Sequence, residues 1–209
     1  MRRHLLLSFA FLLLLVTSSA GAETSQEEAF GAMREQLERQ PLLRADFRQE
    51  RNLQILQRPL KSSGRMVLRE GDGILWRVEE PHAITYLIRS GEILEWEAGD
   101  RPQRTAMAAV PAFRLMTEMF LAALAGDPTA LQEGFRAEPL PADQGWRLRL
   151  SPKSEDLAGL IADLEVAGDR YVEEVHLREV KGDAVTFYFS NFKTEPAELD
   201  ATEKAYFAH

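Results

Sequence analysis

The chain has 209 residues, no cysteine, and 33 acidic against 25 basic residues, giving a formal net charge of −8. The lack of cysteine excludes disulfides, thiol catalysis, cysteine metal sites and the lipid-modified cysteine of a bacterial lipoprotein. The acidic balance argues against a nucleic-acid partner, because binding of a phosphate backbone requires clustered lysine and arginine.

The first 22 residues have the pattern of a cleaved secretory signal peptide. A basic start at residues 2–4 precedes the apolar run Leu5–Val16, and residues 20–22 read Ala-Gly-Ala, an A-x-A cleavage site. The alternative is a retained anchor helix, but the run is short for a bilayer span of roughly 20 residues. Without these residues the formal charge is −10, from 33 acidic and 23 basic residues. We therefore expect one domain over residues 23–209, exported to the bacterial periplasm.

The mature part is predicted to open with an amphipathic helix. Residues 25–28 have the S-x-x-E spacing of a capping box, in which two side chains satisfy free backbone N–H groups. Phe30, Met33 and Leu37 then recur on one face at helical spacing, and Pro41 marks the end. Such a helix needs an apolar surface to cover.

From Leu43 to about Met107 the apolar residues recur with period two. Turn signals about ten residues apart predict antiparallel strands in meander order rather than βαβ units. Alternation places large apolar side chains on one face of these strands, namely Met66, Leu68, Ile74, Trp76, Val78, Ile84, Tyr86, Ile88, Leu94 and Trp96. The opposite face carries mainly arginine and glutamate, although Leu75 and Leu87 are apolar there too.

A second amphipathic helix is predicted from Pro111 to about Ala125, with one further turn over 129–133. Its apolar stripe consists of Phe113, Met116, Phe120 and Leu124, widened by Met119 and Ala123. Strands are predicted again at 146–150, which contains Trp146 and Leu148, and at 160–168, 171–180 and 184–190. The tail 198–207 fits either a helix or a strand. The expected fold is one antiparallel sheet, strongly curved or nearly closed, with helices over one face.

No catalytic constellation appears in the sequence. The G-x-S-x-G, P-loop, G-x-G-x-x-G and H-E-x-x-H patterns are absent. His82, His176 and His209 have no second ligand at metal spacing. Adjacent carboxylates such as Glu79-Glu80 point to opposite faces of a strand and cannot work as an acid/base pair. We expect neither an enzyme nor a metal or other cofactor, and on these residues alone the apolar face is more typical of ordinary core than of a ligand cavity.

A set of short motifs occurs in order along the mature chain. They are Phe47 with Gln49, the glycine-led strand Gly64–Leu68, Leu75-Trp76 followed by Glu80-Pro81, Glu95-Trp96-Glu97, Leu150-Ser151-Pro152, and the closing strands Val175–Val180 and Val185–Asn191. Together they resemble the LolA-like outer-membrane lipoprotein carriers of Gram-negative bacteria, and the chain is similar to a divergent member of that family.

The resemblance implies a mainly β fold, an incomplete β-barrel with a helical lid over an apolar cavity. It also implies a monomer that shuttles acylated proteins or related lipids from an inner-membrane exporter to an outer-membrane acceptor. Leaving one chain of about 15 methylenes in water costs on the order of 12 kcal/mol, which a carrier must offset. By this resemblance the cavity is lined by Phe47, Met66, Leu68, Ile74, Trp76, Val78, Ile84, Tyr86, Trp96, Trp146 and Leu148, and the lid by Phe30, Met33, Leu37, Phe113, Met116, Met119 and Phe120.

The chain departs from the family at its gating arginine. The family places an arginine followed by proline six residues before the aromatic; here Glu70 takes that place, with Arg69 before it and no proline. Arg69 is the candidate gating residue. Two other functions stay open: a non-transport periplasmic interaction or sensing module that uses the same sheet face, and an esterase-like enzyme whose nucleophile and base converge in the cavity.

Overall fold

The computed structural model describes residues 29–97, 101–106, 111–125, 127 and 129–209, with the backbone alone for residues 111–116, 119 and 130. Its strands are β1 (Leu42–Asn52), β2 (Leu60–Arg69), β3 (Gly73–Glu80), β4 (Ile84–Ile88), β5 (Glu92–Trp96), β6 (Gln103–Ala106), β7 (Phe135–Pro139), β8 (Trp146–Pro152), β9 (Ile161–Gly168), β10 (Val172–Glu179) and β11 (Ala184–Lys193). Its helical segments are residues 29–36, α2 (Pro111–Leu124), α3 (Thr129–Gly134), α4 (Glu155–Ala158) and α5 (Ala201–Phe207). The predicted signal peptide and the capping box at 25–28 lie outside the described residues.

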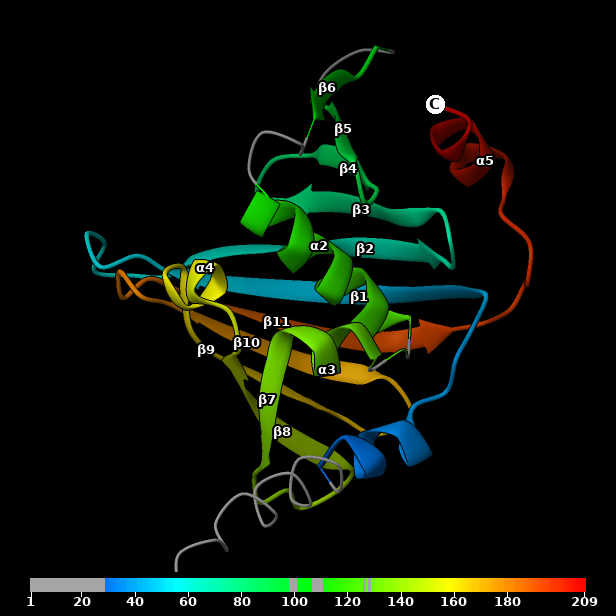
Figure 1. The fold of residues 1–209 in the computed structure, drawn as a ribbon. Coiled ribbons are helices and arrows are strands. Elements are labelled where there is room, and N and C mark those ends of the chain that lie inside the picture. Colours follow the sequence, from blue (N-terminus) through cyan, green and yellow to red (C-terminus); the bar gives the residue numbers. More distant parts are fainter. Residues whose placement is uncertain (1–28, 98–100, 107–110, 126, 128) are drawn as a thin grey trace, which may run out of the picture.

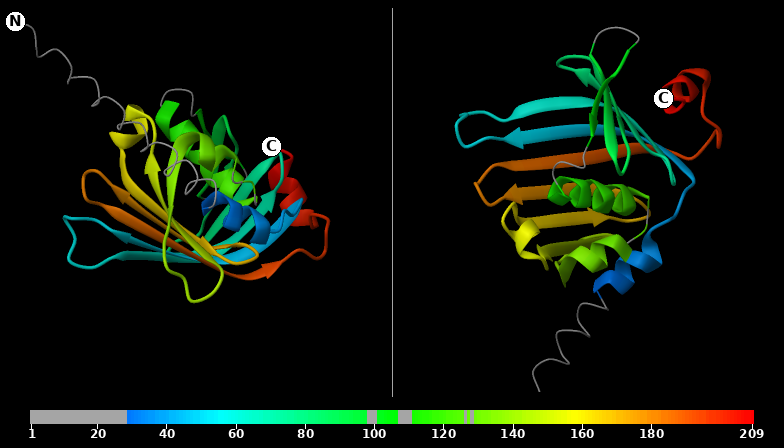
Figure 2. Two further views of the ribbon diagram at one scale, coloured as in Figure 1. Left: turned by 60° about the horizontal axis from the view of Figure 1, so that its bottom comes forward. Right: turned by 45° about the horizontal axis from the view of Figure 1, so that its top comes forward.

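One 11-stranded antiparallel sheet forms the body of the molecule, in the order β6-β5-β4-β3-β2-β1-β11-β10-β9-β8-β7. Strands β1 to β6 follow one another in chain order, as do β7 to β11, and the pairing of β1 with β11 joins the two halves. The sheet curves around α2 and α3 without closing, because β6 and β7 are its two edges (Figures 1 and 2). The predicted curved antiparallel sheet with helices over one face is confirmed.

Three short elements were not predicted. β6 reads QRTA and is exposed along its whole length, so no apolar alternation reveals it. β7 reads FRAEP and ends in a proline at the edge of the sheet, where a missing N–H is tolerated. α4 is a single turn whose N-cap, Ser154, accepts a hydrogen bond from the Leu157 N–H. None of the three shows the longer periodicity on which sequence prediction depends.

Both faces of the sheet carry an apolar core. On the concave face, residues 29–36, α2 and α3 contribute to a core that contains Ile74 and Trp76. On the convex face, α5 contributes to a smaller core that contains Leu75 and Phe207. Ile74, Leu75 and Trp76 are consecutive, so the alternation of a strand sends Leu75 to the opposite face. The convex face is therefore shielded from solvent beneath α5, although much of the rest of this face carries charged side chains.

Trp96 lies on the convex face, so its predicted place in the lining of the concave cavity is wrong. Tyr86 pairs with Trp76 on β3 and with Glu95 on β5, so Glu95 shares their face and Trp96 does not. Leu94 and Trp96 belong to the convex core with α5. Alternation within β5 was read correctly, but it cannot say which face an apolar residue takes when both faces carry a core.

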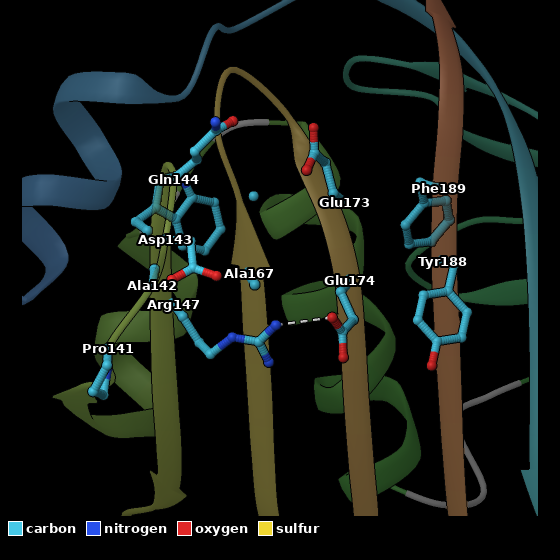
Figure 3. Close-up of a pocket in the computed structure, with 12 residues that line it drawn as sticks. Pro141, Ala142, Asp143, Gln144, Arg147, Ala167, Glu173, Glu174, Tyr188 and Phe189 are labelled. Atoms are coloured by element: carbon cyan, nitrogen blue, oxygen red, sulfur yellow. Dashed lines mark hydrogen bonds and ion pairs between the residues drawn. The ribbon is translucent and has the colours of Figure 1, made fainter.

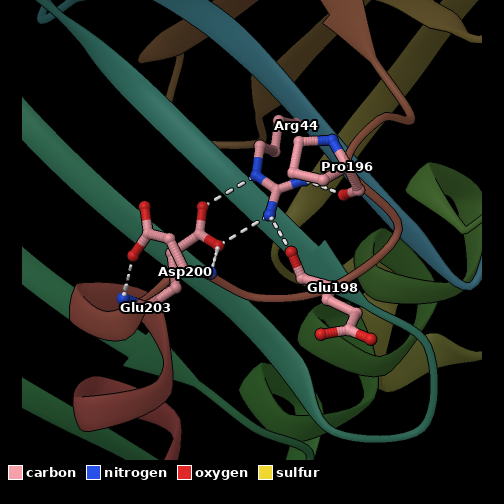
Figure 4. Close-up of polar contacts among 5 residues, drawn as sticks. All are labelled: Arg44, Pro196, Glu198, Asp200 and Glu203. Carbon is pink, nitrogen blue, oxygen red and sulfur yellow. Dashed lines mark hydrogen bonds and ion pairs between the residues drawn. The ribbon is translucent and has the colours of Figure 1, made fainter.

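The C-terminal tail is a helix, held to β1 by a half-buried arginine. Arg44 donates from Nε and Nη2 to the Glu203 carboxylate at 2.7 Å each, and from Nη1 and Nη2 to the carbonyl oxygens of Pro196 and Glu198 at 2.8 and 2.9 Å (Figure 4). The hydrogen bonds with Glu203 raise the pKa of Arg44, against the opposing effect of burial. Asp200 and Glu203 complete a capping box at the start of α5.

Candidate apolar binding site

Four aromatic side chains form a layer at the centre of the concave face: Phe47 on β1, Trp76 on β3, and Phe187 and Phe189 on β11. We call them the aromatic layer. The rings of Phe47 and Trp76 stack with centroids 3.9 Å apart, and Phe187 and Phe189 meet Trp76 edge-on at 5.6 and 6.1 Å. Phe120 of α2 lies over them, 5.7 Å from Phe187 and 6.4 Å from Trp76.

Gly64 on β2 explains why Phe47 and Trp76 can stack. Neighbouring strands lie about 4.8 Å apart, so side chains on β1 and β3 ordinarily have a β2 side chain between them. Gly64 pairs with Phe47 on one side and with Val78 on the other, and it has no side chain to fill this position. The Phe47 ring can therefore cross β2 and lie against Trp76.

Three of the four residues of the aromatic layer are buried in this structure, and Phe187 is half-buried. Trp76 is 6% exposed, and Phe47 and Phe189 are also buried. An apolar ligand can reach Trp76 only if α2 moves away or the aromatic side chains change rotamer. The layer is therefore an apolar surface under a helix, filled by its own side chains.

Most residues predicted to line a cavity lie in the concave core. Phe47, Met66, Leu68, Ile74, Trp76, Trp146 and Leu148 are buried there, and Val78 and Tyr86 pack against it. Ile84 is half-buried and pairs with Val78 on the same face. Of the predicted lid, Phe30 and Met33 are buried in this core and Leu37 and Phe120 pack against it. The side chains of Phe113, Met116 and Met119 lie outside the described part of the chain.

Phe187 and Phe189 are the site residues that sequence reasoning missed. The strand that carries them was predicted, and the two phenylalanines occupy alternate positions in AVTFYFS. The sequence thus indicates that Phe187 and Phe189 share a face of the strand. It does not indicate their contact with Trp76, because that contact depends on the pairing of β1 with β11, which are more than 130 residues apart in sequence.

The gating role predicted for Arg69 stays a prediction, and the structure places this residue on the convex side of β2. It follows the concave residue Leu68 and therefore points to the convex side. There it is exposed and forms an ion pair with Asp72, Nη1 to Oδ2, at 3.2 Å. An arginine at this place can brace the β2–β3 turn.

Tyr86 adds a polar group at the border of the concave core. On the sheet, Tyr86 pairs in register with Trp76 of β3 and with Glu95 of β5. Burial raises the pKa of Tyr86, and the negative charges of Glu95 and Glu97 raise it further. The phenol therefore stays neutral around neutral pH and keeps a proton to donate.

Two hollows are lined by described residues, and the lining of the larger one includes Phe189 of the aromatic layer. One, of about 570 Å³, opens on the convex face beside Arg147, Glu174 and Tyr188 (Figure 3). Arg147 already pairs with Glu174 at 2.9 Å, so it is not free for an anionic ligand. The other, of about 290 Å³, lies where residues 29 and 32 meet the β7–β8 hairpin. The lining of this smaller hollow is mostly apolar and includes Trp146 and Leu148 of the concave core.

Within the described residues, no group of three or more histidine, aspartate or glutamate side chains is arranged to hold a metal ion. In that same part of the chain, no helix has both the length and the apolar character needed to cross a bilayer.

Several solved structures match this chain at low sequence identity. They include a LolA superfamily protein from Nitrosomonas europaea (8% identity, TM-score 0.42, 87% of this chain and 96% of that chain). A putative outer membrane lipoprotein-sorting protein domain from Vibrio parahaemolyticus matches at 13% identity and TM-score 0.45, over 90% of this chain and 100% of that one. The MucA/MucB complex of Pseudomonas aeruginosa matches at 14% identity and TM-score 0.45, over 88% of this chain and 62% of that one.

Comparison with curated proteins gives no match. A family model described as outer membrane lipoprotein carrier protein LolA-like matches residues 22–206, which is nearly the whole chain. That span contains every strand of the sheet and the whole aromatic layer. The chain belongs to the LolA-like family of outer-membrane lipoprotein carrier proteins.

Proposed function

We propose that the protein is a periplasmic carrier that binds the acyl chains of lipoproteins or related lipids and shuttles them from the inner to the outer membrane. The acyl chain lies against the aromatic layer after α2 has moved aside. Membership of the LolA-like family supports a carrier or binding role. The observation that carries the proposal is the set of four aromatic rings from distant strands, gathered under Phe120 of a single helix.

The energetics of such an exchange are favourable. Exposing one phenylalanine side chain such as that of Phe120 to water costs about 1.5–3 kcal/mol of free energy. Burying an acyl chain of about 15 methylenes returns on the order of 12 kcal/mol. The chain can therefore replace several helix contacts and still be bound, and no covalent step is required.

Single-tryptophan variants test the proposal. The chain has three tryptophans, so Trp96→Phe with Trp146→Phe leaves only Trp76 as a fluorophore. Titration with a brominated fatty acid should quench Trp76 saturably, because bromine quenches on contact. The matched control, Trp76→Phe with Trp146→Phe, leaves Trp96 in the convex core and should show little quenching.

The largely buried aromatic layer favours one competing function, a non-transport interaction module with a permanently filled core. If the protein has that function, the fluorescence of Trp76 should stay unquenched at every concentration of fatty acid. The protein should also be isolated in a stable complex with a protein that carries no acyl chain. This pair of results would contradict the carrier proposal. Quenching of Trp96 alone would place the ligand under α5 and would also contradict it.

A further inference from the structure

The exposed apolar side chains gather at one end of the sheet. Among the described residues, the large hydrophobic side chains that are 42% to 88% exposed are Ile55, Leu56, Leu60, Leu160 and Val180. We call this set the loop edge. Scattered single hydrophobic residues are normal on a surface, but a set that shares one end of a molecule is typical of an interaction site.

Two turns build the loop edge together. The β1–β2 turn and the β10–β11 turn project side by side beyond the sheet (Figures 1 and 2). The Gln54 N–H donates to Asp183 Oδ1 at 3.0 Å, which ties the first turn to the second. The Val180 N–H donates to the Leu160 carbonyl at 3.0 Å, which ties the second turn to the start of β9. Ile55, 88% exposed, is the most exposed of the set.

Basic residues surround the Ile55 end of the loop edge. Residues 51–61, which form the β1–β2 turn and its flanks, contain three basic residues and no acidic residue, in a chain whose net charge is −8. Arg51, Arg58 and Lys181 are exposed and have no ion-pair partner within the described residues. An apolar tip with long basic side chains beside it is the arrangement that inserts into a bilayer interface while its charges meet lipid phosphates.

We propose that the loop edge docks on a lipid bilayer with anionic headgroups. Ile55 and Leu56 enter the interface, and Arg51, Arg58 and Lys181 contact the headgroups. The exposed apolar tip beside these basic side chains complements a bilayer interface, in which an apolar layer lies beneath anionic headgroups. Glu155 and Asp156 of α4 lie at the Leu160 end of the loop edge, where anionic headgroups repel their negative charges. The Ile55 end therefore lies closer to the membrane than the Leu160 end.

The loop edge is continuous with the concave face. Phe187 of the aromatic layer and Val185 lie two residues apart on β11, on one face. Val185 pairs with Arg51, and Arg51 pairs with Leu60 of the loop edge. Docking would thus bring this end of the aromatic layer to the membrane. The docking proposal itself rests on exposure and charge and does not require the carrier proposal to hold.

A fluorescent probe tests insertion, since the chain has no cysteine of its own. Ile55→Cys in the chain without residues 1–22 is labelled with an environment-sensitive dye and mixed with vesicles of phosphatidylethanolamine and phosphatidylglycerol. The emission should shift to the blue and be quenched by spin-labelled lipid. The control, Gln144→Cys with the same label, sits in an exposed loop lining the convex hollow and should not change.

Charge variants test the headgroup contact. Arg51→Gln with Arg58→Gln should weaken binding to the anionic vesicles roughly 30-fold. Arg34→Gln with Arg77→Gln removes equal charge away from the loop edge and should change binding less than twofold. An unshifted probe at position 55, equal binding to phosphatidylcholine vesicles, or capture of a protein or a second copy of the chain instead of vesicles would overturn the proposal. None of these readouts involves fatty-acid binding, so the carrier proposal is tested separately.

Discussion

At the residue scale, Gly64 is the position where the backbone leaves no room for a side chain. A Cβ atom at Gly64 would lie 1.9 Å from the Arg77 carbonyl oxygen on β3. That contact is with backbone, so relief requires β2 and β3 to separate beside Phe47 and Trp76. The glycine-led strand of the family resemblance thus has a physical reason in this chain.

Gly64→Ala should lower the free energy of unfolding by about 1–3 kcal/mol, the usual cost of overpacking. Urea unfolding followed by circular dichroism measures it as a lower midpoint with an unchanged slope. Gly91→Ala is the control, because a Cβ there meets nothing within 4 Å and stability should stay within about 0.5 kcal/mol. Equal midpoints for the two variants would show that β2 and β3 can separate without cost.

The same scale shows where sequence reasoning works and where it stops. Alternation placed Met66, Trp76 and Tyr86 on one face correctly, because those strands are long and their register follows from short turns. It misplaced Trp96, because the convex face also carries a core. Leu75 and Leu87 were the available sign of that second core, since they are apolar on the face expected to be wet.

At the element scale, α5 owes its position to one ion pair as well as to apolar burial. The side chains of Arg44 and Glu203 are 16% and 9% exposed, and the carboxylate accepts two hydrogen bonds from the guanidinium. Solvent screens such a pair far less than the exposed pairs elsewhere on the sheet. The Asp200-x-x-Glu203 spacing of a capping box indicates the helix in the sequence, but its docking on β1 is a contact between residues 159 apart in sequence.

Glu203→Gln should destabilise the fold by about 2–3 kcal/mol, because Arg44 keeps its charge in a half-buried place with a weaker acceptor. Thermal unfolding measures this as a lower midpoint. Glu198→Gln changes charge equally but leaves intact the Glu198 carbonyl that Arg44 uses, so it should be nearly neutral. If both variants melt alike, α5 is held by its apolar contacts alone.

At the scale of the whole molecule, the sheet and its helical cover differ in how firmly they are held. β1 and β11 lie at the centre of the sheet and are hydrogen-bonded on both sides. α2 belongs to no sheet, and its side chains contact the sheet at residues such as Phe120, which lies on the aromatic layer. The spacing of turn signals predicted the first meander, whereas the joining of β1 to β11 and the open edges depend on non-local pairing that local pattern does not encode.

Hydrogen exchange should therefore show α2 opening while the sheet stays intact. Amides in β1 and β11 are expected to exchange only through global unfolding, and amides in α2 through a local opening that costs several kcal/mol less. Mass spectrometry of peptides across residues 111–125 and 184–193 separates the two classes. A fatty acid that occupies the aromatic layer should change the exchange of α2 and leave that of β11 nearly unchanged. Exchange of α2 as slow as that of β1 would mean that the helix is part of a permanent core, and the aromatic layer would then be packing rather than a binding surface.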